Sequence, residues 1–343
     1  MPKAIVKPRL ALVAVIVCAL PMCAQDRGHD AGIANAALAG DVSVITEALL
    51  RRHVSVIADD SMRGRATPSA GLDKTASYIA AQFERLKLKG GGDRGTFIQT
   101  YPVPTRPDVR APNVVAILEG EDPALKGQYV VFSAHMDHVG VGAPVGGDSI
   151  YNGADDNASG TAAVLALAEA FARAAQRPRR SIIFLTVSGE EHGLWGSAYF
   201  ASHPPVPLDS MVAALNIDMI GRNWRDTLVA IGREHSDLGA TVDSVAARHR
   251  ELRISTIDDP WPNEQFYFRS DHYNFAKRGV PALFFFSGTH ADYHGPDDEV
   301  DRIDFEKETR IVQLLYQVGV ELANAAKRPV WNPESYRRIV GQR

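Results

Sequence analysis

Histidines and acids in five short polar segments of this 343-residue sequence are the residues most able to do chemistry. The candidates are His135, Asp155, Glu191, Asp218 and His294, with Asp137 and Glu190 close to two of them. Imidazole and carboxylate ligands without cysteine suit zinc, with manganese or cobalt as alternatives. A carboxylate that does not bind metal can serve as a general base. The residue types therefore indicate a metal centre that also carries out acid–base chemistry.

Each segment also has an ordinary structural interpretation. Asp155 and Asp156 precede a predicted helix, where acidic residues often cap the helix amino terminus. Glu190 and Glu191 could lie on the surface, and His294 could be a loop histidine with satisfied hydrogen bonds. The surface interpretation is weakened for the two glutamates because they follow an apolar strand, where adjacent carboxylates repel each other unless a cation is near.

The number of candidate ligands favours two metal ions over one. A catalytic zinc typically takes about three protein ligands. The five candidates exceed that number, but they supply three ligands to each of two ions if one carboxylate is shared. The sequence therefore predicts two zinc ions with a bridging carboxylate between them.

Hydrophobic patterning predicts the elements that position these residues. Apolar runs predict buried strands over 113–118, 129–134, 181–187 and 281–286, with another ending near Asp218, and helical spacing predicts helices over 41–58, 71–88 and 161–175. This alternation predicts an α/β fold with a mixed, largely parallel central sheet and helices on both faces. In such sheets ligands bind beyond the carboxyl ends of the strands, where most of the polar segments fall. His135 and Asp137 are two apart on an extended chain, so both can face one site.

The amino terminus predicts an exported protein. Residues 1–24 combine a basic stretch ending at Arg9 with an apolar run that is too short to span a bilayer, which is typical of a cleaved signal peptide. We therefore expect a periplasmic or secreted protein without stable membrane insertion, and a lipoprotein anchor at Cys23 is the alternative. Residues 25–343 contain no long linker, which predicts a single catalytic domain with a short C-terminal extension on its surface. The net charge of −4 and the lack of a basic run give no support for nucleic-acid binding.

An ordered set of motifs covers about 63–304. The set consists of His135-x-Asp137, Gly153-Ala154-Asp155-Asp156-Asn157-Ala158-Ser159-Gly160, Glu190-Glu191-His192-Gly193-Leu194-Trp195-Gly196-Ser197, Asn216-Ile217-Asp218-Met219, Ser270-Asp271-His272 and Tyr293-His294-x-Pro296-x-Asp298. This set resembles the co-catalytic zinc exopeptidase family, which includes secreted bacterial leucyl aminopeptidases, glutamate carboxypeptidase II and glutaminyl cyclase. Many larger members insert a protease-associated domain before the His-x-Asp strand, and the stretch over 101–114 leaves no room for one.

The resemblance implies a metal role for five residues. Asp155 would bridge the two zinc ions. Glu191 and His294 would complete one zinc site, and His135 and Asp218 would complete the other. A cis peptide bond is implied after the bridging aspartate, between Asp155 and its successor.

The resemblance also implies the catalytic groups. Glu190 would be the general base for a water held by the zinc pair, and Asp137 would be the partner that orients His135. Tyr267 matches a tyrosine that assists the substrate carbonyl in some members, although it could equally be a core aromatic residue. The implied substrates are peptides, and the implied reaction is removal of their amino-terminal residues.

Other functions share parts of this pattern. A carboxypeptidase or dipeptidase would use the same metal core, but the sequence has no compact arginine cluster for a substrate carboxylate. Glutaminyl cyclase has the same fold with one zinc, and the intact motifs around Glu190 and Asp218 favour hydrolysis. A non-catalytic scaffold such as the transferrin receptor would have lost ligands, and none is missing here. The sequence makes no prediction of the oligomeric state.

Overall fold

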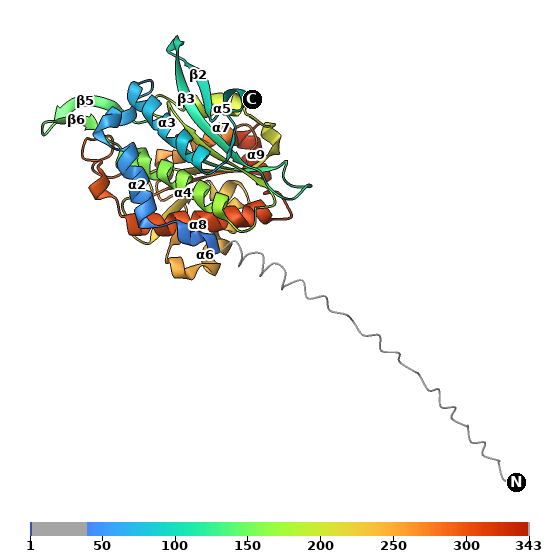
Figure 1. Ribbon diagram of the computed structural model, residues 1–343. Helices are drawn as coiled ribbons and strands as arrows, with labels where there is room; N and C mark the ends of the chain where they lie inside the picture. The colour runs from blue at the N-terminus through green and yellow to red at the C-terminus, as the bar shows by residue number, and fades with distance from the viewer. Residues whose placement is uncertain (2–39, 342–343) are drawn as a thin grey trace.

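The structure is a computed structural model that describes Met1 and residues 40–341 (Figure 1). The predicted signal peptide and both cysteines lie outside the described residues. A nine-stranded sheet forms the centre of the molecule, in the order β1-β3-β7-β4-β8-β11-β9-β10 with β2 paired to β3. Its strands are β1 (Lys89–Gly90), β2 (Ile98–Val103), β3 (Arg106–Leu118), β4 (Tyr129–His135), β7 (Ser181–Val187), β8 (Met211–Ile217), β9 (Thr227–Ile231), β10 (Ser255–Ile257) and β11 (Ala282–Phe286).

The four central strands β7, β4, β8 and β11 are parallel to one another. β3 pairs antiparallel with β7 on one side, and β9 pairs antiparallel with β11 on the other. All residues of β7, β8 and β11 are buried, as expected for strands covered on both faces. These features confirm the predicted mixed, largely parallel sheet. The carboxyl ends of the four central strands therefore meet at one edge.

Helices cover both faces of the sheet (Figure 1). They are α2 (Glu47–Ile57), α3 (Ala70–Arg85), α4 (Gly160–Arg173), α5 (Trp195–Ser202), α6 (Leu238–Arg248), α7 (His272–Ala276), α8 (Phe305–Asn324) and α9 (Pro333–Ile339). On one face, Phe171 of α4 packs against Phe132 of β4 and Tyr316 of α8. On the other face, Phe200 of α5 and Phe275 of α7 pack in a second core with the opposite side chains of the strands. Within residues 40–341, no helix combines the length and apolar character needed to cross a bilayer.

Several elements were not predicted from the sequence, and two of these features are a hairpin and a C-terminal helix. The first is a hairpin of β5 (Gly140–Val145) and β6 (Asp148–Tyr151), which forms a separate two-stranded sheet and projects from the body in Figure 1. The second is α9, because the chain after α8 was predicted to be a surface extension. Ile339 is buried in the second core, and the indole N–H of Trp331 donates to the carbonyl of Gly279 at 2.9 Å. Apolar residues on one side of this short helix are enough to hold it against the body.

A buried arginine ties the segment before α3 to the strand edge. The side chain of Arg65 is fully buried, and its guanidinium donates to the carbonyls of Ile57, Met136, Asn152 and Gly153. Guanidinium groups suit this position because they present several donors in a fixed plane. Arg65 therefore fixes the backbone on both sides of the hairpin relative to the end of β4.

We expect Arg65→Met to lower the free energy of unfolding by at least about 3 kcal/mol, because each buried carbonyl left without a donor costs about 1–3 kcal/mol. Urea unfolding followed by circular dichroism measures this loss. Arg63→Met is the matched control, since Arg63 is exposed and its replacement should change the free energy of unfolding by less than about 0.5 kcal/mol. Equal losses in the two variants would contradict the structural role of Arg65.

Candidate metal centre

The candidate ligands come together at the carboxyl edge of the four parallel strands. His135 is the last residue of β4, and Asp218 follows β8 directly. Glu191 lies in the loop after β7, and His294 lies in the longer loop after β11. The topology of the sheet therefore brings together side chains that are up to about 160 residues apart in sequence.

Two groups of side chains have metal-binding geometry, and both contain Asp156. The first consists of His138, Asp156, Glu191 and His294, and the second consists of His135, Asp156 and Asp218. Within each group, the ligand atoms lie within 4.8 Å of one another. A further group joins His135 to Glu190 and Glu191. The two main groups therefore adjoin each other through one shared carboxylate.

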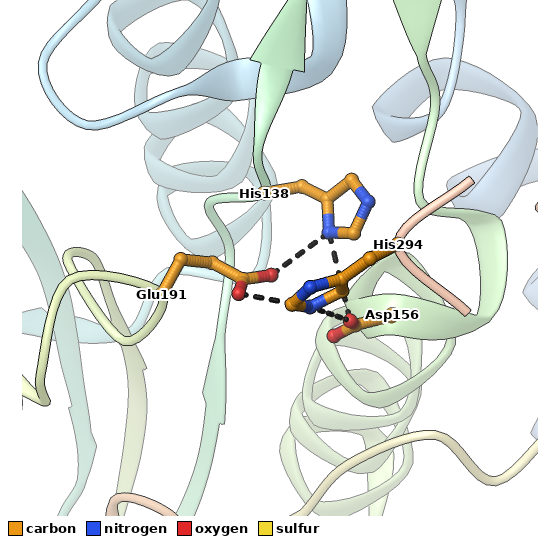
Figure 2. A group of neighbouring side chains, drawn as sticks. All are labelled: His138, Asp156, Glu191 and His294. Carbon is orange, nitrogen blue, oxygen red and sulfur yellow. Dashed lines mark hydrogen bonds and ion pairs between the residues drawn. The ribbon is translucent and has the colours of Figure 1, made fainter. Parts of the chain in front are cut away.

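The first group is shown in Figure 2. The Nε2 atom of His294 lies 3.0 Å from one carboxylate oxygen of Asp156 and 3.0 Å from one of Glu191. The Nδ1 atom of His138 lies 2.9 Å from the other oxygen of Glu191. Both carboxylates are almost completely buried. Two imidazoles and two carboxylates thus converge on one small region.

The second group uses the opposite oxygen of Asp156. The Nε2 atom of His135 lies 3.3 Å from Oδ1 of Asp156 and 3.3 Å from Oδ1 of Asp218, whereas the first group contacts Asp156 through Oδ2. The two oxygens of one carboxylate thus face different groups, which is the arrangement required of a bridging ligand. The hydroxyl of Ser270 donates to the other oxygen of Asp218 at 3.1 Å and helps to orient that carboxylate.

Asp155, the bridging residue expected from the sequence, does not belong to either group. Its Oδ1 accepts a hydrogen bond from the backbone N–H of Gly221 at 2.7 Å, and its Oδ2 lies 3.3 Å from Nε2 of His290. The cis peptide bond is also one residue later than expected, between Asp156 and Asn157. The carboxylate that belongs to both groups is therefore that of Asp156 and not that of Asp155, because consecutive side chains in this turn point to opposite sides.

Asp137 contacts both His135 and the glutamate loop. Nδ1 of His135 lies 3.2 Å from the backbone carbonyl of Asp137 and 3.7 Å from its carboxylate. The carboxylate accepts hydrogen bonds from the backbone N–H of Gly189 at 2.7 Å and from the hydroxyl of Thr67 at 2.8 Å. This geometry is consistent with a residue that orients His135, and it also fixes the backbone just before Glu190.

The structure places Tyr267 in the core. Its ring packs edge-on against His235 and His272 at centroid distances of 4.3 and 4.9 Å, and its buried hydroxyl has no hydrogen-bond partner among the described residues. The tyrosine beside the metal groups is Tyr293, which lines the same pocket as His135. The position of Tyr267 is therefore that of a core aromatic residue.

Three residues of the candidate site were not predicted from the sequence: Asp156, His138 and Tyr293. All three are direct neighbours of predicted residues, so the motifs indicated the right segments but not the right positions within them. His138 follows the His-x-Asp motif by one residue, and a third histidine or acid there was a signal available in the sequence.

Burial and charge together control the ionisation of the site. Burial lowers the pKa of His135, but Asp218, Asp137 and Asp156 outweigh it and raise the pKa well above its usual value. Burial likewise opposes protonation of His294, yet Asp156 and Glu191 raise its pKa to about 10. Both imidazoles are therefore held beside negative charge that attracts cations.

The donor set fits divalent metal ions of the zinc class. Among the described residues, Asp218 Oδ1 and His294 Nε2 are buried atoms whose close contacts do not have hydrogen-bond geometry, which is costly unless another partner is bound. Nitrogen and carboxylate ligands in groups of three and four match the coordination numbers of zinc. The residues present could therefore hold two ions that share Asp156.

The fold and this site fit a metal-dependent hydrolase, in which one carboxylate belongs to both groups of metal-binding side chains. Residues 113–319 match the model of peptidase family M28, and the chain belongs to this family. This confirms the family resemblance and the enzyme class, a zinc metallopeptidase, that the motifs predicted.

Several known proteins are similar to this chain, in sequence or in fold, over most of its length. A probable zinc metalloprotease from Leptosphaeria maculans is 32% identical over 66% of this chain and 53% of its own length. Leupeptin-inactivating enzyme 1 from Streptomyces exfoliatus is 29% identical over 70% of this chain and 48% of its own length. The chain thus matches about half the length of these two relatives. The solved structure of an aminopeptidase from Aneurinibacillus sp. strain AM-1 has the same fold, with a TM-score of 0.65 and 15% identity over 85% of this chain and 97% of that one.

We expect Asp156→Asn to lose both metal ions, because the shared carboxylate loses its charge while the shape of the side chain is kept. Asp155→Asn is the matched control and should retain both ions, since an amide oxygen can still accept the hydrogen bond from Gly221. Metal content after dialysis, measured by inductively coupled plasma mass spectrometry, separates the two variants. Greater loss in Asp155→Asn than in Asp156→Asn would contradict the assignment of the shared carboxylate.

Proposed function

We propose that this chain is an exported di-zinc exopeptidase that removes amino-terminal residues from peptides. The observation that carries the proposal is the Asp156 carboxylate, whose two oxygens face two separate groups of metal-binding side chains. The proposed ligands are Asp156, Glu191 and His294 for one ion and His135, Asp156 and Asp218 for the other. Export through residues 1–24 to the periplasm or the medium is part of the same proposal.

The bound zinc ions would polarise the peptide carbonyl and lower the pKa of a bound water from about 15.7 toward 7. Glu190 is the proposed general base. It lies in a group with His135 and Glu191, and it lines the pocket beside the metal positions. Asp137 holds the backbone of its loop through the N–H groups of Gly189 and Glu190. Glu190 is thus positioned to take a proton and return it to the leaving amine.

The pocket next to the metal groups supports a preference for an apolar first residue. It is lined by His135, Asp156, Glu190, Asp218 and Ser270 on its polar side and by Met219, Phe266, Phe284 and Phe286 on its apolar side. A free α-amino group would lie against the carboxylates, and an apolar side chain would lie against the aromatic rings. This arrangement favours an aminopeptidase.

One residue of the pocket favours a dipeptidase or carboxypeptidase instead. Arg269 lines the pocket and could bind the carboxylate of a short substrate. Its guanidinium already lies 3.2 Å from Glu264, and about half of its side chain is exposed. Because the positive charge is paired and open to water, we rank this function second.

We expect Glu190→Gln to retain both metal ions and to lose about 10²–10⁴-fold in turnover, because the variant keeps the shape of the side chain and removes the base. Glu191→Gln is the matched control in the neighbouring position and should also lower the metal content. Steady-state kinetics and metal analysis of the same preparations measure both effects. Equal metal loss in the two variants would show that the roles of the two glutamates are not divided as proposed.

We expect free aminoacyl substrates to be hydrolysed at least about 10-fold faster than their acetylated forms, since carboxylates left without a charged partner cost about 1–3 kcal/mol each. A panel of leucyl and phenylalanyl anilides with free or acetylated amines measures this ratio, alongside dipeptides with blocked amines. Removal of metal with a strong chelator should abolish every activity, and zinc should restore it. Preference for a blocked amine with a free carboxylate would move the assignment to carboxypeptidase, and full activity without metal would overturn the proposal.

A further inference from the structure

We propose that His138 is a ligand of one of the two metal ions, so that one site has four protein ligands and the other has three. This inference rests on the proposed function, because it assumes that the ions bind. It concerns a residue outside the five ligands implied by the family motifs.

The position of the His138 ring supports direct binding. Nδ1 of His138 lies 2.9 Å from Oε1 of Glu191 and 3.7 Å from Oδ2 of Asp156. Nε2 of His294 approaches the same two carboxylates from another direction, at 3.0 Å from each. Figure 2 shows both rings directed toward the region between the carboxylates. An ion placed there would be within reach of all four side chains.

The surroundings of His138 hold the ring in this position. The side chain is fully buried, and Nδ1 is its only nitrogen with a polar partner among the described residues. Gly153 has a φ of +56°, and a Cβ atom there would lie 2.5 Å from Cγ of His138, so only glycine leaves room for the ring. Arg65 donates to the carbonyls of Met136 and Gly153, which fixes the backbone on both sides of the ring.

The unequal ligand sets imply unequal tasks. Zinc with four protein ligands is closed and structural, whereas catalytic zinc has three protein ligands and an open position. The group of His135, Asp156 and Asp218 is the open one, and Glu190 lies in a group with His135. The ion beside His135 would therefore bind substrate, and the ion beside His138 would bind more tightly and fix Asp156 and Glu191.

Zinc titration of the metal-free protein against a chromophoric chelator tests this division. We expect wild type to bind two ions with distinct affinities and His138→Asn to weaken the tighter one by at least about 10-fold, since even the loss of an outer-shell partner typically costs about 10–100-fold. The weaker site should change by less than about threefold. His192→Asn is the matched control, because His192 is an exposed imidazole in the same loop as Glu191 that stacks on Trp195. The His192→Asn variant should bind both zinc ions with the affinities of the wild-type protein.

Cobalt substitution distinguishes a ligand from a hydrogen-bond partner of Glu191. The proton NMR spectrum of the di-cobalt protein should contain three exchangeable imidazole N–H signals shifted by the metal, from His135, His138 and His294, and His138→Gln should lose one. Two signals in wild type, or wild-type zinc affinity in His138→Gln, would overturn the inference and leave the proposed function intact. Failure of wild type to bind zinc would overturn both.

Discussion

Repulsion among buried carboxylates is the constraint on which the rest of this site depends. The carboxylates of Asp156, Glu191 and Asp218 lie in adjoining groups, and all three are almost completely buried from water. Carboxylates removed from water destabilise the fold unless positive charge is placed among them. Protonated histidines would supply part of this positive charge. The neighbouring carboxylates raise the pKa of His135 and of His294, which shows how strongly the site attracts cations. Two divalent ions would neutralise the same charge at fixed points.

The protein keeps these carboxylates in place through contacts behind them. Backbone N–H groups of Asp155 and Asp156 donate to the carboxylate of Asp298, which follows the His294 loop. Asp137 binds the backbone before Glu190, and Arg65 binds the backbone around His138. Each ligand-bearing loop is therefore fixed by a buried charged group that does not itself face the metal positions. The cost of burying those charges is offset because nearly every one of their polar atoms has a backbone partner.

The strands could be predicted from the sequence because burial leaves a direct pattern of apolar residues. The runs over 129–134 and 181–187 agree with β4 and β7 to within one residue. The positions of His135, Asp218 and His294 then followed from the rule that sites lie at the carboxyl ends of parallel strands. What could not be predicted was the direction of each side chain inside a turn. Asp155 and Asp156 are identical in type and adjacent in sequence, so only the backbone path from Gly153 onward decides which one faces the ligands.

The aspartate that does not face the metal positions has a structural task that explains its burial. Asp155 accepts a hydrogen bond from the backbone N–H of Gly221, three residues after Asp218. Ser159, four residues after Asp155, accepts at its hydroxyl from the backbone N–H of Ile220 at 3.3 Å. These contacts join the turn that carries Asp156 to the loop that carries Asp218, so the two carboxylates of the second group are fixed to one another. Because the distance between these two carboxylates determines where an ion could bind, the adjacent aspartates have different roles. Asp155 joins the two loops, and Asp156 belongs to both groups of metal-binding side chains.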